Sequence, residues 1–285
     1  MKFKYNLFSK YKNNNIRLKY NLFSKYNDNL LIIGSKKYNN LQINDIIDDF
    51  ICFRCNLAVP NGKNGNKCNG FFLNNHLFEN LINKNVNKET FLNYYKIKSK
   101  DDKDRITTVY NKFNEIKNKL DFIITNHRYN LILNNSNSFL NHIGCKFRFK
   151  KILSIGYSGI LISLMNNFNN NKIFVFGFSI NKLRMSFYYN DKKKPNGCHD
   201  FENELEILKW LHNNKYIDIT LCLLEDSNEK IINCQELNPN PDTLKKLFNI
   251  YGSVTLINYN NQTIYILENE KINYLKINND KIILN

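Results

Sequence analysis

Residues 154–204, SIGYSGILISLMNNFNNNKIFVFGFSINKLRMSFYYNDKKKPNGCHDFENE, decide how this chain folds. They contain a small Ser-Gly turn at Gly156–Gly159 that opens a helix, then the apolar strand Ile173–Phe178, a tyrosine pair, and a second helix beginning near His199. Glycine-bearing turns that join parallel strands to helices are common binding sites for phosphate groups. The stretch therefore predicts an α/β unit with an anion-binding turn and one imidazole beside it.

Apolar runs and helical segments alternate along the chain from Leu30 onward. The first run ends in Gly34-Ser35, which is typical of the first strand and turn of a Rossmann-like unit. Strands that alternate with helices favour a mainly parallel sheet covered on both faces. We expect strands at Leu30–Ile33, Phe50–Arg54, Phe71–Leu73, Asp121–Thr125, Lys151–Ser154, Ile173–Phe178 and Asp218–Leu224, and helices at His76–Asn83, Lys88–Tyr95, Thr107–Leu120 and from near His199.

The two ends of the chain differ from this α/β pattern. Residues 1–29 contain KYNLFSKY twice, which we interpret as a duplicated basic, aromatic segment, with a surface anchor for a membrane or a partner as the alternative. Residues 251–285 alternate apolar and polar residues between Asn-rich turns, which predicts a β-meander appended to the α/β domain of residues 30–250. Its strands are expected at Val254–Tyr259, Thr263–Leu267, Ile272–Ile277 and Ile282–Leu284.

The chain is strongly basic, with 41 Lys and Arg against 25 Asp and Glu and a formal net charge of +16. Such a surface attracts anions in general: nucleic acid, an anionic membrane or a nucleotide donor. The basic residues are spread along the chain, so we do not expect nucleic-acid binding as the main function. The sequence has neither an apolar run of about 18 residues nor a secretory signal, so we expect a soluble, cytoplasmic protein.

No metal site is expected. Cys52 and Cys55 have the spacing of a zinc-binding pair, but both fall in an apolar strand pattern and no second pair follows. The aspartate pairs at 48–49 and 101–102 lack a further well-placed carboxylate, and we interpret both as solvated, the second in a charged loop. The seven cysteines are odd in number, and several lie in expected strands, which favours reduced thiols.

His199 is the strongest candidate for a catalytic side chain. It begins the segment HDFENELEILKWLHNN, whose apolar residues share one helix face, so His199 would lie in the first turn of a helix that packs on the core. A histidine there can contact a phosphate or act as a base at neutral pH. A capping or surface histidine is the alternative that its position alone favours. Four histidines have no comparable setting, and the last of them is expected to be exposed: His76, His127, His142 and His212.

Four short segments, in this order, resemble the motifs of the sialyltransferase family of eukaryotic type, glycosyltransferase family 29. The resemblance covers roughly residues 30–224. The large motif is matched by the apolar strand into Gly34-Ser35, then Arg54-x-Asn56 and Gly65-x-Lys67; the small motif by Ser158-Gly159 and Gly177-Phe178; the third motif by Phe187-Tyr188-Tyr189-Asn190; and the very small motif, HxxxxE, by His199 and Glu204.

The resemblance implies a GT-A-like α/β domain and an inverting transfer of sialic acid from CMP-sialic acid to a hydroxyl of an acceptor glycan, without a metal or another cofactor. It implies that His199 removes the acceptor proton, that Asn56 contacts the ribose or phosphate, and that Ser158 with Gly159 holds the cytidine. The other donor-binding positions would be Ser35, Gly177, Tyr188 and Tyr189; Glu204 would be structural, and Arg54 could be structural or could face the donor.

Three positions depart from the family pattern. Ser35 replaces the usual asparagine, Cys68 a threonine and Phe187 the histidine of the third motif. These departures leave open a non-catalytic nucleotide- or glycan-binding relative. A transferase that uses another CMP-activated acid sugar is the other alternative.

Overall fold

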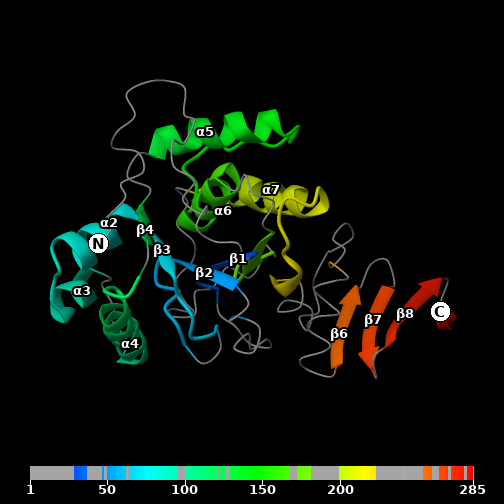
Figure 1. Ribbon diagram of the computed structural model, residues 1–285, viewed down its shortest axis with the longest axis horizontal. Coiled ribbons are helices and arrows are strands. Elements are labelled where there is room, and N and C mark those ends of the chain that lie inside the picture. Colours follow the sequence, from blue (N-terminus) through cyan, green and yellow to red (C-terminus); the bar gives the residue numbers. More distant parts are fainter. Residues whose placement is uncertain are drawn as a thin grey trace.

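The computed structural model describes residues 29–36, 47, 50–61, 64–94, 100–120, 122–125, 129–166, 172–180, 199–222 and 240, together with the backbone of four C-terminal strands. A parallel sheet lies at the centre of the α/β part (Figure 1), with strand order β4-β3-β2-β1-β5. This confirms the expected fold class. The strands are β1 (Asn29–Ile33), β2 (Phe50–Cys55), β3 (Gly70–Leu73), β4 (Phe122–Thr125) and β5 (Ile173–Phe176).

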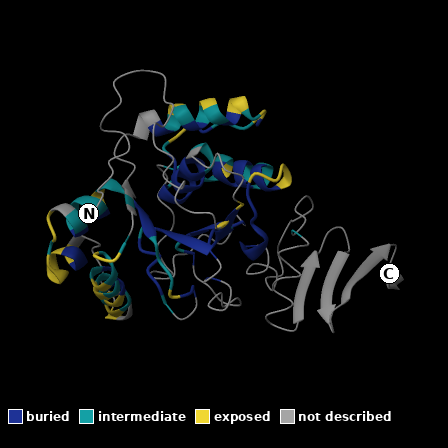
Figure 2. Cartoon of the chain, in the orientation of Figure 1, coloured by how far each residue is buried: buried dark blue, intermediate teal, exposed yellow. Residues whose placement is uncertain are grey.

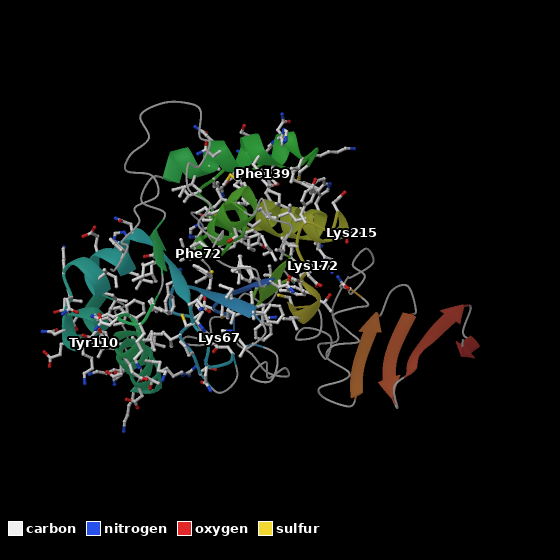
Figure 3. The ribbon with its side chains drawn as sticks, in the orientation of Figure 1. Lys67, Phe72, Tyr110, Phe139, Lys172 and Lys215 are labelled. Atoms are coloured by element: carbon white, nitrogen blue, oxygen red, sulfur yellow. The ribbon has the colours of Figure 1, made fainter. Side chains whose placement is uncertain are left out.

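Helices cover both faces of this sheet. Successive side chains of a strand point to opposite faces, and β3 shows this clearly. Phe72 packs toward α6 (Figure 3), whereas Phe71 belongs to a separate apolar cluster with α3 and α4. The helices are α2 (Asn75–Phe78), the π-helical turn η1 (Glu79–Asn83), α3 (Lys88–Tyr94), α4 (Lys100–Ile116), α5 (Tyr129–His142), α6 (Ile155–Asn166) and α7 (Phe201–Asn213).

The buried core is densest where β1, β2 and β5 meet α6, as the dark blue strands and helix in Figure 2 show. All six residues of β2 are buried. The helix α6 packs across β1, β2, β3 and β5, and α5 lies outside it. Strands buried on both faces explain the continuous apolar runs of the sequence, because no face of such a strand meets water.

The order of the strands creates a switch point between β1 and β5. The chain runs from β1 outward through β2, β3 and β4, and then returns to place β5 on the other side of β1. Connections from the carboxyl ends of β1 and β5 therefore leave in opposite directions. In open parallel sheets, ligands bind in the crevice at such a point.

Two expected strands are wrong, for identifiable reasons. At 151–154 the structure has only an isolated bridge, between Ile152 and His199. At 218–222, the described part of the other expected strand, it has a bridge from Asp218 to Phe174 and then a helical turn at 220–222. The Asp218 carboxylate accepts the N–H of Thr220 at 2.8 Å, and this local bond turns the backbone out of the extended conformation.

Two helices also differ from expectation. The helix α4 begins at Lys100, so the aspartate pair at 101–102 lies in its first turn and not in a loop. The helix α5 was not expected at all, since its sequence YNLILNNSNSFLNH is rich in asparagine, a weak helix former.

The C-terminal residues form a sheet of their own, with order β6-β7-β8-β9 and antiparallel pairing throughout. This confirms the expected meander. Its strands are β6 (Ser253–Asn258), β7 (Thr263–Glu268), β8 (Lys271–Asn278) and β9 (Lys281–Leu284). None of the helices in the described part of the chain is both long and apolar enough to cross a lipid bilayer.

Candidate functional site

The ends of β1 and β5 approach each other closely at the switch point. Gly34 donates its N–H to the carbonyl of Phe176 at 2.8 Å, and Lys36 donates to the carbonyl of Gly177 at 3.0 Å. A Cβ on Gly34 would lie 2.3 Å from the Gly177 oxygen and 2.9 Å from the ring of Phe178. Only glycine fits at this position, because any side chain would separate the two strand ends.

The first turn of α6 lies beside this junction. A Cβ on Gly156 would come within 2.4 Å of the Phe178 ring, and Tyr157 packs edge-on against that ring with centroids 5.9 Å apart. The backbone N–H groups of a first helical turn have no acceptor inside the helix and carry its positive dipole end. Ile155, Gly156 and Tyr157 are themselves buried, so this turn is packed against the junction.

Ser158 and Gly159 lie deeper in α6 than the sequence predicts. The expected turn at 156–159 is wrong, because the helix already begins at Ile155. Ser158 is buried and donates its N–H to the Ser154 carbonyl at 2.9 Å, so its backbone is not open to a ligand. Gly159 faces Phe72, whose ring would lie 2.8 Å from an added Cβ. Gly159 therefore allows α6 to approach β3.

His199 lies next to the same turn, one residue before the N-cap Asp200 of α7 and not inside the helix as expected. Its Nδ1 is 3.0 Å from the carbonyl oxygen of Ile152. A carbonyl can only accept, so Nδ1 carries the proton in this hydrogen bond and the Nε2 of the neutral ring keeps its lone pair. The half-buried imidazole is thus held in the tautomer that a general base requires.

Two carboxyl groups of α7 hold the segment before α6. The Asp200 carboxylate accepts the N–H of Lys150 at 2.6 Å instead of capping its own helix. Burial alone would raise the pKa of Asp200, but hydrogen bonds from Asn203 and from the backbone of Lys150 and Lys151 bring that pKa below its usual value. The carboxylate is therefore ionised at neutral pH and keeps the backbone beside His199 in place.

Glu204 makes the second connection, at the N-cap of α6. Its Oε1 accepts the backbone N–H of Ser154, and the Ser154 side chain also hydrogen-bonds to the carboxyl group. Burial raises the pKa of Glu204 to about 7, although the bonds from Ser154 lower it in part. Asp200 and Glu204 thus fix the start of α7 against the segment that leads into α6, which is also the segment that His199 contacts.

Asn56 and Ser35 lie at the same carboxyl edge. The β1–β2 register pairs Ile33 with Arg54, and Ser35 and Asn56 each follow two residues later, just beyond the carboxyl ends of the two strands. Asn56 has a positive φ of 50°, and its Oδ1 accepts the N–H of Asn74 at 2.9 Å.

Arg54 has a structural role, because its side chain binds other parts of the protein and not a ligand. Its side chain is fully buried, and its five N–H donors bind the loop that follows β2. The acceptors are the carbonyls of Ala58, Asn64, Gly65 and Lys67 and the side-chain oxygen of Asn64, at 2.8 to 3.2 Å. With every donor used, the guanidinium has none left for an anionic substrate.

The remaining expected positions divide into three groups. Gly177 lies in the junction, with a positive φ of 72°. Tyr188 and Tyr189 lie outside the residues that the structure describes, as does Phe187. The expectation of an exposed His212 is wrong: the chain after α7 folds back over it, and its Nδ1 lies 3.3 Å from the N–H nitrogen of Ile219.

The cysteines of the described part are free and mostly buried. Burial raises the pKa of Cys52, Cys55 and Cys68, so these thiols stay protonated and unreactive. Cys68, which replaces a threonine in the family pattern, directs its sulfur to the Gly70 carbonyl. Within the described ranges, no three His, Cys, Asp or Glu side chains are grouped so that they could hold a metal ion.

Two functional positions were missed in the sequence. Ser154 is the N-cap of α6, and Ile152 supplies the carbonyl that orients His199. A serine just before an apolar helix is a recognised helix-start signal, so Ser154 could have been found. The role of Ile152 has no such signal, because it depends on a backbone oxygen brought near by tertiary folding.

No protein-family model matches the chain, and no curated protein matches it. Among solved structures, the sialyltransferase CST-II in complex with CMP aligns at 14% identity over 67% of this chain and 79% of that chain, with a TM-score of 0.36. CstII from Campylobacter jejuni with cytidine-5'-monophosphate aligns at 16% identity over 90% of this chain and 93% of that chain, with a TM-score of 0.40. The same enzyme with CMP-3FNeuAc aligns at 13% identity over 90% of this chain and 94% of that chain, with a TM-score of 0.41. Similarity at this level does not place the chain in a family.

Proposed function

We propose that this chain is an inverting, metal-independent glycosyltransferase that moves sialic acid from CMP-sialic acid to a hydroxyl group of an acceptor glycan. The observation that carries the proposal is the setting of His199. Its Nδ1–H is fixed by the carbonyl of Ile152 at 3.0 Å, and Ile152 lies three residues before the start of α6, near the switch point. A histidine held in the tautomer of a base, close to a strand switch point, is what supports a nucleotide-sugar transferase.

In the proposed reaction, Nε2 of His199 takes the proton of the acceptor hydroxyl as its oxygen bonds to the anomeric carbon. The bond from that carbon to the phosphate oxygen breaks on the opposite face, so the configuration inverts and CMP leaves with the bonding electrons. The N–H groups of residues 155–157 stabilise the charge that grows on the phosphate. These steps use only side chains and backbone of this chain and need no metal.

The donor contacts of the proposal follow from the placement of each residue. Asn56 and Ser35 would reach the ribose or phosphate from the ends of β2 and β1, and Gly177 allows the donor to approach β5 closely. Tyr188 and Tyr189 stay proposed phosphate contacts on the resemblance of their motif alone. Ser158 and Gly159 act indirectly, by placing the first turn of α6.

The test is a His199→Ala variant in a transfer assay with CMP-sialic acid and a panel of acceptor glycans. We expect turnover to fall by roughly a hundredfold or more, with CMP affinity retained, because a positioned base contributes about 10²–10⁴-fold. His142→Ala, an exposed histidine at the end of α5, is the matched control and should keep full activity. Unchanged turnover in His199→Ala would refute the proposed role.

The same assay separates the alternatives. Faster turnover with a different CMP-activated acid sugar would reassign the donor and leave the mechanism intact. Tight CMP binding without transfer or donor hydrolysis would identify a non-catalytic relative. Activity that a chelator abolishes would contradict metal independence, and a product with retained anomeric configuration would contradict inversion.

A further inference from the structure

His199 and Asp200 are neighbours in the chain, and both side chains bind the backbone of residues 150–152. The Asp200 carboxylate accepts the N–H of Lys150 at 2.6 Å, and the Nδ1 of His199 donates to the carbonyl of Ile152 at 3.0 Å. These two hydrogen bonds close a small ring made only of residues 150–152 and 199–200. The bond at Asp200 therefore restricts how far the Ile152 oxygen can move from the imidazole.

The Asp200 carboxylate is itself held in place. Its Oδ2 also accepts a hydrogen bond from the side chain of Asn203 at 2.9 Å, and only 9% of Asp200 is exposed. Asp200 is the N-cap residue of α7, yet its side chain does not cap that helix. An aspartate at this position usually binds the N–H groups of its own first turn. Its use for another segment indicates that holding residues 150–152 is its main task.

The bond to Ile152 determines which nitrogen of His199 can act as a base. Imidazole free in water favours the tautomer that is protonated at Nε2, whereas a bond to a carbonyl oxygen requires the proton at Nδ1. If the Ile152 carbonyl moved away, the ring would return to the Nε2–H tautomer. In that tautomer Nε2 has no lone pair with which to take the proton of an acceptor hydroxyl.

Other contacts hold the same stretch of backbone, but they lie further from the imidazole. Asn137 of α5 exchanges two hydrogen bonds with the backbone of Phe149, at 2.9 and 3.0 Å. Glu204 binds the N–H of Ser154 from a position further along α7. The first contact does not involve α7, and the second fixes the end of the stretch next to α6. Among these three contacts, the one made by Asp200 is nearest to the imidazole in the chain.

We propose that Asp200 is a positioning residue that keeps the imidazole of His199 in its Nδ1–H tautomer by holding the Ile152 carbonyl within reach. This inference rests on the proposed function, because the tautomer matters to turnover only where Nε2 acts as the base. Asp200 touches neither donor nor acceptor in this role. Its loss lowers turnover through the state of the imidazole and leaves substrate binding unchanged.

The test measures the tautomer of His199 in the ligand-free proteins by ¹⁵N NMR at about pH 8.5, where imidazole rings are neutral. The two ring nitrogens have different chemical shifts in each tautomer, and comparison with His199→Ala identifies the His199 signals. The unchanged protein should show the Nδ1–H tautomer, and Asp200→Ala should move the signals toward the Nε2–H tautomer.

The transfer assay supplies the second measurement. In Asp200→Ala, kcat should fall by about tenfold or more, because a histidine base in the wrong tautomer can lose up to about 10⁴-fold in turnover. The KM for CMP-sialic acid should stay unchanged, since Asp200 does not touch the donor. A loss confined to KM would contradict a role in positioning the base.

Three further variants separate this role from a general loss of structure. Asp200→Asn keeps a side-chain oxygen for the N–H of Lys150 and should keep the tautomer and most of the turnover. Asn137→Ala removes two hydrogen bonds from the same stretch of backbone and should lower stability with the tautomer unchanged. Glu206→Gln removes an equal charge from α7, at a group that pairs with Lys209, and should alter neither the tautomer nor turnover.

An unchanged tautomer in Asp200→Ala, or an equal shift in Asp200→Asn or Asn137→Ala, would overturn the inference and leave the proposed function standing. Should Asp200→Ala fail to fold, Lys150→Pro removes the same hydrogen bond from the other side, and the absence of a tautomer shift there would overturn the inference. If even the unchanged protein transfers no sialic acid, the proposed function fails, whereas the NMR comparison still shows whether Asp200 positions the imidazole.

Discussion

At the scale of single residues, Arg54 shows how a motif residue can have a structural task. We predict that Arg54→Lys destabilises the protein by about 3–5 kcal/mol, because lysine cannot reproduce five hydrogen bonds in a planar fork and leaves buried carbonyls unpaired. Urea unfolding followed by circular dichroism measures this loss. Arg105→Lys, at a partly exposed position on α4, should cost less than about 1 kcal/mol and serves as the control.

The outcome also bears on function. If the Arg54→Lys variant folds at low temperature, its affinity for CMP should equal that of the unchanged protein. The reason is that no N–H group of Arg54 is left to bind a ligand. A selective loss of CMP affinity at unchanged stability would show that the guanidinium contacts the donor after all.

The role of a single residue could be predicted from the sequence where the local sequence pattern determines that role. His199 could be selected because it stands just before an amphipathic helix, and the structure places its ring against the Ile152 carbonyl in the segment before α6. His212 could not be predicted, because the chain after α7 covers it only through a turn at Lys215, which has a positive φ of 63°. The neighbours that matter most to His199 are backbone atoms, and these carry no sequence signal.

At the scale of elements, the joint between α6 and α7 predicts a pH dependence of stability. Burial raises the pKa of Glu204 from 4.5 to about 7, so the folded state binds more protons than the unfolded state between these values. Its contribution to stability is therefore complete below about pH 4.5 and is lost as the pH rises through 7. A shift of this size corresponds to about 3 kcal/mol.

Glu204→Gln should remove this dependence, because glutamine keeps an acceptor for the Ser154 N–H and has no charge to bury. The difference in unfolding free energy between Glu204→Gln and the unchanged protein should grow in favour of the variant by up to about 3 kcal/mol between pH 4.5 and 8. Urea titrations at several pH values measure it. If the difference in unfolding free energy stays constant with pH, the folded protein does not hold Glu204 as a buried, ionised carboxylate.

Elements were predictable where apolar runs are long and end in turn residues. All five strands of the parallel sheet follow such runs. The bridges at Ile152 and Asp218 were mistaken for strands because a short apolar run does not reveal whether a neighbouring strand is available for pairing. The helix α5 was hidden by its asparagines, and it is stabilised by packing against α6 more than by its own propensity.

At the scale of the whole molecule, the order of the strands predicts where a ligand would bind. One switch point occurs in the described parallel sheet, and the ends of β1 and β5 and the starts of α6 and α7 converge on it. Hydrogen exchange with and without CMP tests this placement across the molecule. We expect slower exchange at residues 34–36, 154–157, 177–180 and 199–204, because a bound phosphate supplies acceptors and orders these segments.

The cluster formed by α3 and α4 should show no change in exchange on CMP binding, because its apolar core is separate and lies on the other face of β3. Neutral cytidine is the control ligand: without a phosphate it should protect residues 154–157 far less than CMP does, since the proposal places the phosphate at the start of α6. The strong positive charge of the chain could also draw CMP to scattered lysines, but such binding would be screened by salt and would protect no contiguous segment. Protection centred on residues 88–116, or lost entirely at 0.5 M salt, would therefore contradict a site at the switch point.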